Sequence, residues 1–208
     1  VDDSLRVVQY VRRNPQRFDA KLPARPRELY GTRNANLLAV SSGQGSVLTV
    51  LRPDDQPGKI ALPAGDAAST FWGDLVAIAA DSAVVLVEPE HPDRKRSIPV
   101  DGHARAVIFS PSGHRFYVAQ REGPVLVYNR FTREQMDEID LPGAAASLRA
   151  DPFGRWLMVH PQGSDSLWLV DLAKNKLVDR FHCDWAVDLP TVTNSQTLLL
   201  KQGDDVVA

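Results

Sequence analysis

Five carboxylic acids stand at the ends of short apolar runs and are the residues best placed for acid–base chemistry: Glu28, Asp66, Asp101, Asp151 and Asp188. Two carboxyl groups that face each other across a cleft can hydrolyse a glycosidic bond, one as the acid and the other as nucleophile or base. Turn formation explains Asp66, Asp101 and Asp151 as well, because aspartate is common in turns. Glycosidase-like hydrolysis is therefore an alternative function, and no residue is assigned as catalytic.

Other arrangements typical of catalysis or cofactor binding are missing from the sequence. The five histidines are spread along the chain without the spacing of metal ligands. His182, Cys183 and Asp184 form the densest cluster, but successive side chains of a strand point to opposite faces, so Cys183 would point away from the other two. No glycine-rich phosphate loop is present. We expect no metal, no cofactor and no enzymatic activity.

Aromatic residues in turn-like sequence are the better indication of binding. Phe71, Trp72 and Phe153 align with the Pro-Ser-Gly turn at residues 111–113, so they would lie on one face of the fold. Aromatic side chains commonly anchor protein partners. These three residues are the predicted binding patch, whereas Trp156 and Trp168 occupy strand positions and are expected to pack in the core.

A repeat in the sequence predicts the strands and turns that would position these residues. Val107-Ile-Phe-Ser-Pro-Ser-Gly113 returns as Leu148-Arg-Ala-Asp-Pro-Phe-Gly154, with the prolines 41 residues apart, and the next step of 41 falls on Thr193. Short runs rich in β-branched residues recur with the same period and are separated by polar turns. A period near 40 built from such runs is typical of a β-propeller blade of four strands.

The fold class is therefore all-β, a β-propeller of four-stranded blades of about 40 residues, expected as a single domain over residues 1–208. Its expected parts are a half-blade, four blades and a second half-blade: 1–23, 27–63, 67–99, 104–142, 144–182 and 186–208. The halves either meet and close five blades, or the chain is part of a larger propeller. For Ser4–Arg13, an amphipathic helix is the competing interpretation.

The inner strands of these blades would begin near Arg27, Ala67, Arg105, Ala146 and Ala186. These segments are rich in Ala, Gly and Ser, which lets strands crowd together around an axis and offers few functional groups. The axis is therefore expected to be structural.

Two segments resemble a known family of repeats. Gly102-His103 followed by Val107–Gly113 is similar to the opening of a WD-type repeat, and Asp165–Leu172 followed by Asn175–Val178 is similar to its third and fourth strands. The bacterial YVTN-type repeats share these features. The Trp-Asp dipeptide of WD repeats never appears at the strand end, where Val170-Asp171 and Tyr128-Asn129 stand instead. The resemblance implies a divergent, bacterial propeller that serves as a binding platform.

The composition of the chain limits the classes of partner that it can bind. The formal charge of −2 on 208 residues and a pI near 6.2 argue against nucleic-acid binding, and no apolar run is long enough to span a bilayer. A single cysteine leaves cytoplasm and cell envelope both open. We expect a non-catalytic protein-binding or scaffold domain of a larger protein, with a purely structural module as a further alternative. Its oligomeric state is left open.

Overall fold

A computed structural model describes residues 4–11, 14–32, 37–43, 45–52 and 56–208, which contain strands and turns but no helix. In these ranges, therefore, no helix is available that could cross a membrane. Residues 1–3 and 12–13 of the expected first half-blade, and residues 33–36, 44 and 53–55 of the next blade, lie outside the described residues.

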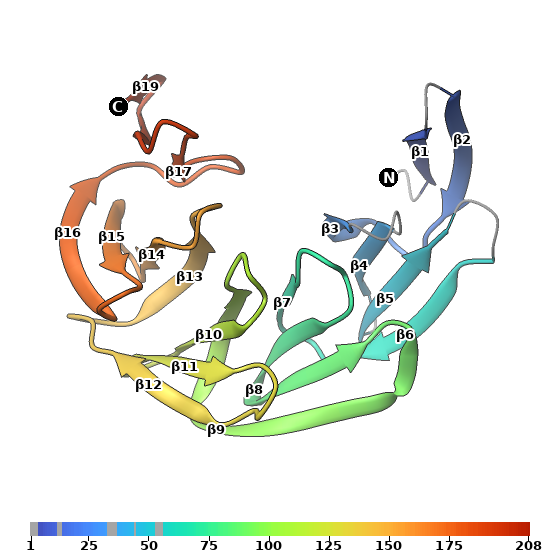
Figure 1. Ribbon diagram of the computed structural model, residues 1–208, viewed down its shortest axis with the longest axis horizontal. Coiled ribbons are helices and arrows are strands. Elements are labelled where there is room, and N and C mark those ends of the chain that lie inside the picture. Colours follow the sequence, from blue (N-terminus) through green and yellow to red (C-terminus); the bar gives the residue numbers. More distant parts are fainter. Residues whose placement is uncertain (1–3, 12–13, 33–36, 44, 53–55) are drawn as a thin grey trace.

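Within these described residues, nineteen strands form five antiparallel sheets that follow one another along an arc (Figure 1). The first two sheets contain β1 (Ser4–Val11) and β2 (Asn14–Lys21), then β3 (Pro26–Gly31), β4 (Leu37–Gly43), β5 (Gly45–Leu51) and β6 (Gly58–Leu62). The third contains β7 (Asp66–Ser69), β8 (Val76–Glu88), β9 (His91–Phe109), β10 (Arg115–Gln120), β11 (Val125–Asn129) and β12 (Gln135–Ile139). The last two contain β13 (Ala145–Ala150), β14 (Trp156–Pro161), β15 (Ser166–Asp171) and β16 (Lys176–His182), then β17 (Thr191–Val192), β18 (Leu198–Gln202) and β19 (Asp205–Val207). This is a β-propeller, as the repeat predicted.

The third sheet joins two blades. β8 contains both apolar runs expected as separate strands, with Asp81 at φ 54° between them. β9 pairs with β8 from His91 to Ala104 and with β10 from Ala104 to Phe109. Because only four residues separate Pro99 from Ala104, and Asp81 pairs with Ala104, the outer strand of one blade continues into the inner strand of the next.

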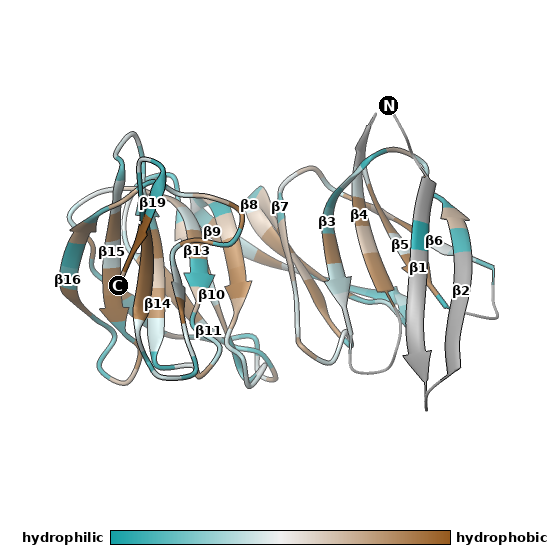
Figure 2. Ribbon diagram, turned by 90° about the horizontal axis from the view of Figure 1, so that it is seen from above, coloured by the Kyte–Doolittle hydropathy of each residue, from teal (hydrophilic) through white to brown (hydrophobic). Residues whose placement is uncertain are grey.

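Apolar side chains pack between consecutive sheets rather than in one central core. Residues of β4 and β5, such as Leu38 and Leu48, pack against Val76 and Ile78 of β8. Further along the arc, Phe116 stacks on Tyr128 with ring centroids 4.9 Å apart, in a cluster that also contains residues of β8. Burying each large apolar side chain contributes about 1.5–3 kcal/mol. Figure 2 shows the apolar colours concentrated on the strands.

The two ends of the chain differ from the expectations. Ser4–Val11 is a strand paired with Asn14–Lys21, so the helical interpretation is wrong. The last inner strand was expected from Ala186, but it is the short β17 at Thr191–Val192; residues 186–189 form a turn closed by a bond from the Ala186 N–H to the Leu189 carbonyl. The sheets of β1–β2 and β17–β19 do not pair with each other in the described residues, and the arc is open between them (Figure 1). The chain therefore does not close a fifth blade on itself.

Candidate functional site

One turn recurs at the end of the inner strand in four successive blades. The backbone N–H of its first residue donates a hydrogen bond across the turn, to the backbone carbonyl of Leu75, Arg115, Trp156 or Thr197. Its fourth residue has a positive φ, which favours glycine. The first residues are Thr70, Ser110, Asp151 and Thr193, and the fourth are Gly73, Gly113, Gly154 and Gln196. The period read from the sequence is thus the period of this turn.

The first side chain of the turn bonds back into it. Asp151 is fully buried, and its carboxylate accepts hydrogen bonds from the N–H groups of Phe153, Arg155 and Trp156 at 2.6–2.8 Å. The Ser110 hydroxyl accepts from the Arg115 N–H at 3.1 Å. Asp151 therefore holds the turn together, and its carboxylate oxygens are occupied by backbone donors.

The second and third residues of these turns are exposed, except Pro111, which is half-buried. Phe71, Trp72 and Phe153 are 56%, 44% and 53% exposed. The structure brings Phe71 and Trp72 together, with edge-to-face rings 5.9 Å apart, and it places Phe153 in the equivalent turn two blades further along.

The intervening turn lies close to both neighbouring turns. A Cβ on Gly113 would lie 3.8 Å from the side chain of Thr70, and one on Gly154 would lie 3.5 Å from Pro111. The predicted patch residues thus occupy successive turns of one face, without one continuous contact among the three.

A fourth exposed aromatic on this face was not foreseen. Phe131, in the turn between β11 and β12, is 61% exposed. The Arg130 guanidinium lies 5.2 Å from its ring centroid, and His114 packs against it at 5.6 Å. The segment Asn129-Arg-Phe-Thr132 could have indicated it, because asparagine is common in turns. The Asn129 side chain accepts hydrogen bonds from the N–H groups of Phe131 and Thr132.

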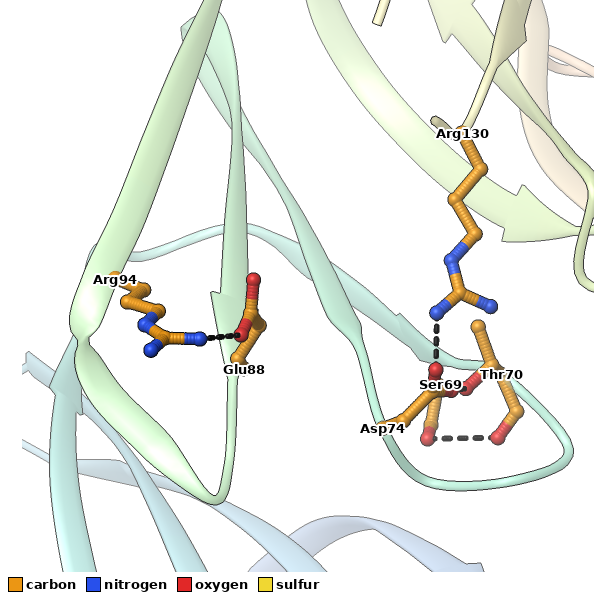
Figure 3. Close-up of polar contacts among 6 residues, drawn as sticks. All are labelled: Ser69, Thr70, Asp74, Glu88, Arg94 and Arg130. Carbon is orange, nitrogen blue, oxygen red and sulfur yellow. Dashed lines mark hydrogen bonds and ion pairs between the residues drawn. The ribbon is translucent and has the colours of Figure 1, made fainter. Parts of the chain in front are cut away.

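A hollow of about 430 Å³ opens beside Phe131. Arg130 pairs with Asp74 on its wall, and the Thr70 hydroxyl donates to the same carboxylate at 2.6 Å (Figure 3). Partial burial opposes ionisation of Asp74, but the bonds from Thr70 and Arg130 outweigh it and hold its pKa below the ordinary value. Across the hollow, Arg94 lies 3.7 Å from Glu88 (Figure 3). A second hollow, of about 630 Å³, lies between the turns of Ser110 and Phe153.

The axis contains more charged and aromatic side chains than the sequence predicted. A hollow of about 540 Å³ is lined by Glu28 and Asp66 together with Tyr30, Arg149 and Trp185. Burial raises the pKa of Asp66. Burial and the neighbouring Asp66 raise the pKa of Glu28. Small residues line parts of the inner strands, as expected, and arginine and aromatic residues that were not expected at the axis stand between them.

The axial groups are largely engaged within the protein. Asp66 accepts a bond from the Val107 N–H at 3.0 Å, and Tyr30 donates to the Ala67 carbonyl at 2.5 Å. Arg149 donates to carbonyls of Ala186, Val187 and Pro190. These bonds fix one blade to the next. Of the five carboxylates singled out in the sequence, only Glu28 and Asp66 line this hollow.

The cluster at His182 is not a nucleophile pair. Cys183 is buried, and burial raises the pKa of its thiol. Asp184 instead pairs with Lys201 at 3.3 Å. Within the described ranges, no group of three or more His, Cys, Asp or Glu residues is placed to hold a metal ion.

Antiparallel sheets that follow one another around an axis define the fold of the chain as a β-propeller. Its sequence matches no family model and no curated protein. Known structures share the fold. Hydrazine synthase of Kuenenia stuttgartiensis is 19% identical with a TM-score of 0.63, over 76% of this chain and 49% of that one. AztD of Citrobacter koseri, in its apo form, is 14% identical with a TM-score of 0.55, over 79% and 48%.

The β-propeller domain of Cps50 (Swd1) from Myceliophteria thermophila is 12% identical with a TM-score of 0.65, over 86% of this chain and 62% of that one. The chain thus spans about half the length of the first two structures and less than two thirds of the third. At these identities the likeness establishes the fold alone, and a fold does not by itself imply a function.

Proposed function

We propose that this chain is a non-catalytic protein-binding platform, and that its partner binds the face formed by the turns that follow the inner strands. Exposure of Phe71, Trp72 and Phe153 is the observation that carries the proposal. The turn depends on its first and fourth residues, so nothing in its geometry calls for aromatic side chains at the second and third. Full burial of a large apolar side chain contributes about 1.5–3 kcal/mol. Because these three side chains are about half exposed, a partner that covers them would gain roughly half of that for each.

We also infer that these residues are part of a larger, bacterial propeller protein, with residues 1–208 contributing to one domain. The open arc in Figure 1 supports this, as does an exposed Val206 on β19 of the last sheet. A neighbouring blade packed on that sheet would cover apolar surface, as it does between the other blades.

A hydrolase with axial carboxylates is the second candidate, because Glu28 and Asp66 line one hollow. The bond from Val107 to Asp66 speaks against it: an acid or nucleophile must present its oxygen to the substrate. A purely structural module would need no exposed aromatic face.

The test is affinity capture with quantified retention of each protein that the wild-type chain enriches. The double variant Trp72→Ala/Phe153→Ala is compared with Met136→Ala/Val178→Ala, which removes exposed apolar side chains from the outer strands β12 and β16. We expect retention of a specific partner to fall about tenfold, or ~1.4 kcal/mol, in the first variant only. Equal retention by both variants would remove the support for this face.

A further inference from the structure

Two hollows on the turn face are neighbours and share a wall. The first is lined by residues of β8, β9 and the β11–β12 turn, and the second by the turns of Ser110 and Phe153. His114 lines the second hollow and Phe131 the first, and their rings are 5.6 Å apart. The Arg130 N–H also bonds to the His114 carbonyl at 3.0 Å. The two hollows therefore form one continuous surface across the boundary of two blades.

This surface is positively charged, in contrast to the whole chain. Six arginines and three carboxylates line the two hollows: Arg94, Arg96, Arg115, Arg130, Arg133 and Arg155 against Asp74, Glu88 and Glu90. With histidines neutral, the excess is three positive charges, whereas the chain carries a net −2. A local field of this sign attracts and orients acidic partners.

The carboxylates of the surface are already paired. Asp74 pairs with Arg130, Glu88 with Arg94, and Glu90 with Arg52 at 2.7 Å. Arg96 and Arg133 are exposed, and among the described residues neither forms an ion pair with a carboxylate. Arg115 and Arg155 of the second hollow also form no ion pair with a carboxylate among the described residues. Arg96 and Arg133 line the first hollow together with Phe131, so these two guanidinium groups are the best placed to bind charge from outside the chain beside that ring.

We propose that this arginine-lined surface binds an acidic segment of a protein partner, with its carboxylates on Arg96 and Arg133 and an apolar side chain against Phe131. The inference rests on the proposed function, since it names the chemistry of the partner for the same face. A guanidinium binds a carboxylate through two parallel hydrogen bonds. The exposed ring of Phe131 supplies the apolar contact that makes such a site more than a charge attraction.

Protein is favoured over nucleic acid as the occupant. A nucleic-acid backbone is contacted along a continuous basic stripe, but here Asp74, Glu88 and Glu90 alternate with the arginines in the hollow. An acidic peptide can place its carboxylates at the unpaired arginines and other side chains near these three acids.

The test measures fluorescence anisotropy of a fluorescein-labelled peptide composed of Glu, Asp and Phe. Matched peptides have Lys or Gln in place of every acidic residue, and a labelled single-stranded DNA serves as the alternative polyanion. The chain variants are Arg96→Glu/Arg133→Glu and, as a control with the same charge change on outer strands, Lys59→Glu/Arg180→Glu. Circular dichroism checks that each variant keeps its strand content.

We expect the acidic peptide to bind the wild type and the control variant alike, and at least about tenfold more weakly to Arg96→Glu/Arg133→Glu. Binding should weaken as ionic strength rises from about 0.1 M to about 1 M, because the Debye length shortens from about 10 Å to about 3 Å. The inference is overturned if the Gln peptide binds equally well, if both variants weaken binding equally, if the acidic peptide does not bind, or if DNA binds more tightly than the peptide.

Failure of the proposed function looks different. If Trp72→Ala/Phe153→Ala releases a captured protein while Arg96→Glu/Arg133→Glu retains it, the face binds protein and only the acidic chemistry is wrong. If neither variant releases a captured protein, the proposal that the partner binds the turn face is wrong.

Discussion

Removal of the Asp151 carboxylate is the most direct perturbation of the turn that defines this fold. The side chain is fully buried and accepts three backbone N–H groups at 2.6–2.8 Å. In the preceding blade Ser110 holds the equivalent position and accepts one N–H, at 3.1 Å. Asp151→Ala and Ser110→Ala thus remove the same structural role with different numbers of hydrogen bonds, in the same protein.

The magnitudes follow from those numbers. A buried donor left without an acceptor costs about 1–3 kcal/mol, so three donors would cost up to about 9 kcal/mol if all stayed dry. Two effects reduce this: the turn lies at the surface, where water reaches the freed donors, and the variant no longer buries a carboxylate. We expect Asp151→Ala to lower the free energy of unfolding by about 3 kcal/mol, against about 1 kcal/mol for Ser110→Ala.

Urea denaturation, followed by tryptophan fluorescence and circular dichroism, measures both changes by linear extrapolation. Asp151→Asn is the isosteric control, because it keeps one acceptor oxygen and loses the charge, and it should fall between the two alanine variants. If the losses of unfolding free energy in Asp151→Ala and Ser110→Ala agree within about 0.5 kcal/mol, the carboxylate contributes nothing beyond a hydroxyl, and its three hydrogen bonds do not hold the turn together.

Two further predictions concern buried titratable groups. Burial raises the pKa of Asp66 above its ordinary 3.8, so its contribution to stability is full below the unfolded-state pKa and is lost as pH rises through the folded-state value. Asp66→Asn should therefore gain stability relative to the wild type as pH is raised from about 4 to about 6, in urea denaturation at a series of pH values; parallel curves would contradict this. Cys183 is buried with a raised thiol pKa, so Ellman's reagent should react slowly in buffer and rapidly in denaturant; complete labelling of the folded chain within seconds would place the thiol at the surface.

The repeat was the part of the fold most readable from sequence. Pro111 and Pro152 follow Ser110 and Asp151. The turn needs a polar first residue and a positive φ at its fourth, and glycine takes that fourth position at residues 73, 113 and 154. The next step of 41 residues, to Thr193, also falls on the first residue of this turn. There Gln196 takes the fourth position, where the other turns have glycine, with φ 60°. Local backbone requirements of this kind are visible in one sequence because they act on neighbouring residues.

Features that depend on distant residues were not readable. The inner strand expected at Ala186 is displaced to Thr191, where the carbonyls of residues 186, 187 and 190 are held by Arg149 from the preceding blade. The axial hollow likewise combines Glu28, Asp66 and Arg149 from three blades. The alanine-rich inner strands predicted an axis with few functional groups. Composition shows which residues are frequent in a segment, but it does not show which of them face the same space.

The arginine-lined surface shows why the turn face suits recognition in this fold. Each turn assigns its first and fourth residues to backbone geometry and leaves its second and third to solvent. Substitutions at Trp72 or Phe153 can therefore change what the face binds with little effect on the turn, whereas a change at Asp151 alters the turn itself. The axis lacks this separation, since Asp66 and Arg149 both bond to the backbone of the adjacent blade. A binding surface can vary without loss of the fold where the residues that maintain the backbone geometry are not the residues that contact a partner. In this chain the turn face meets that condition.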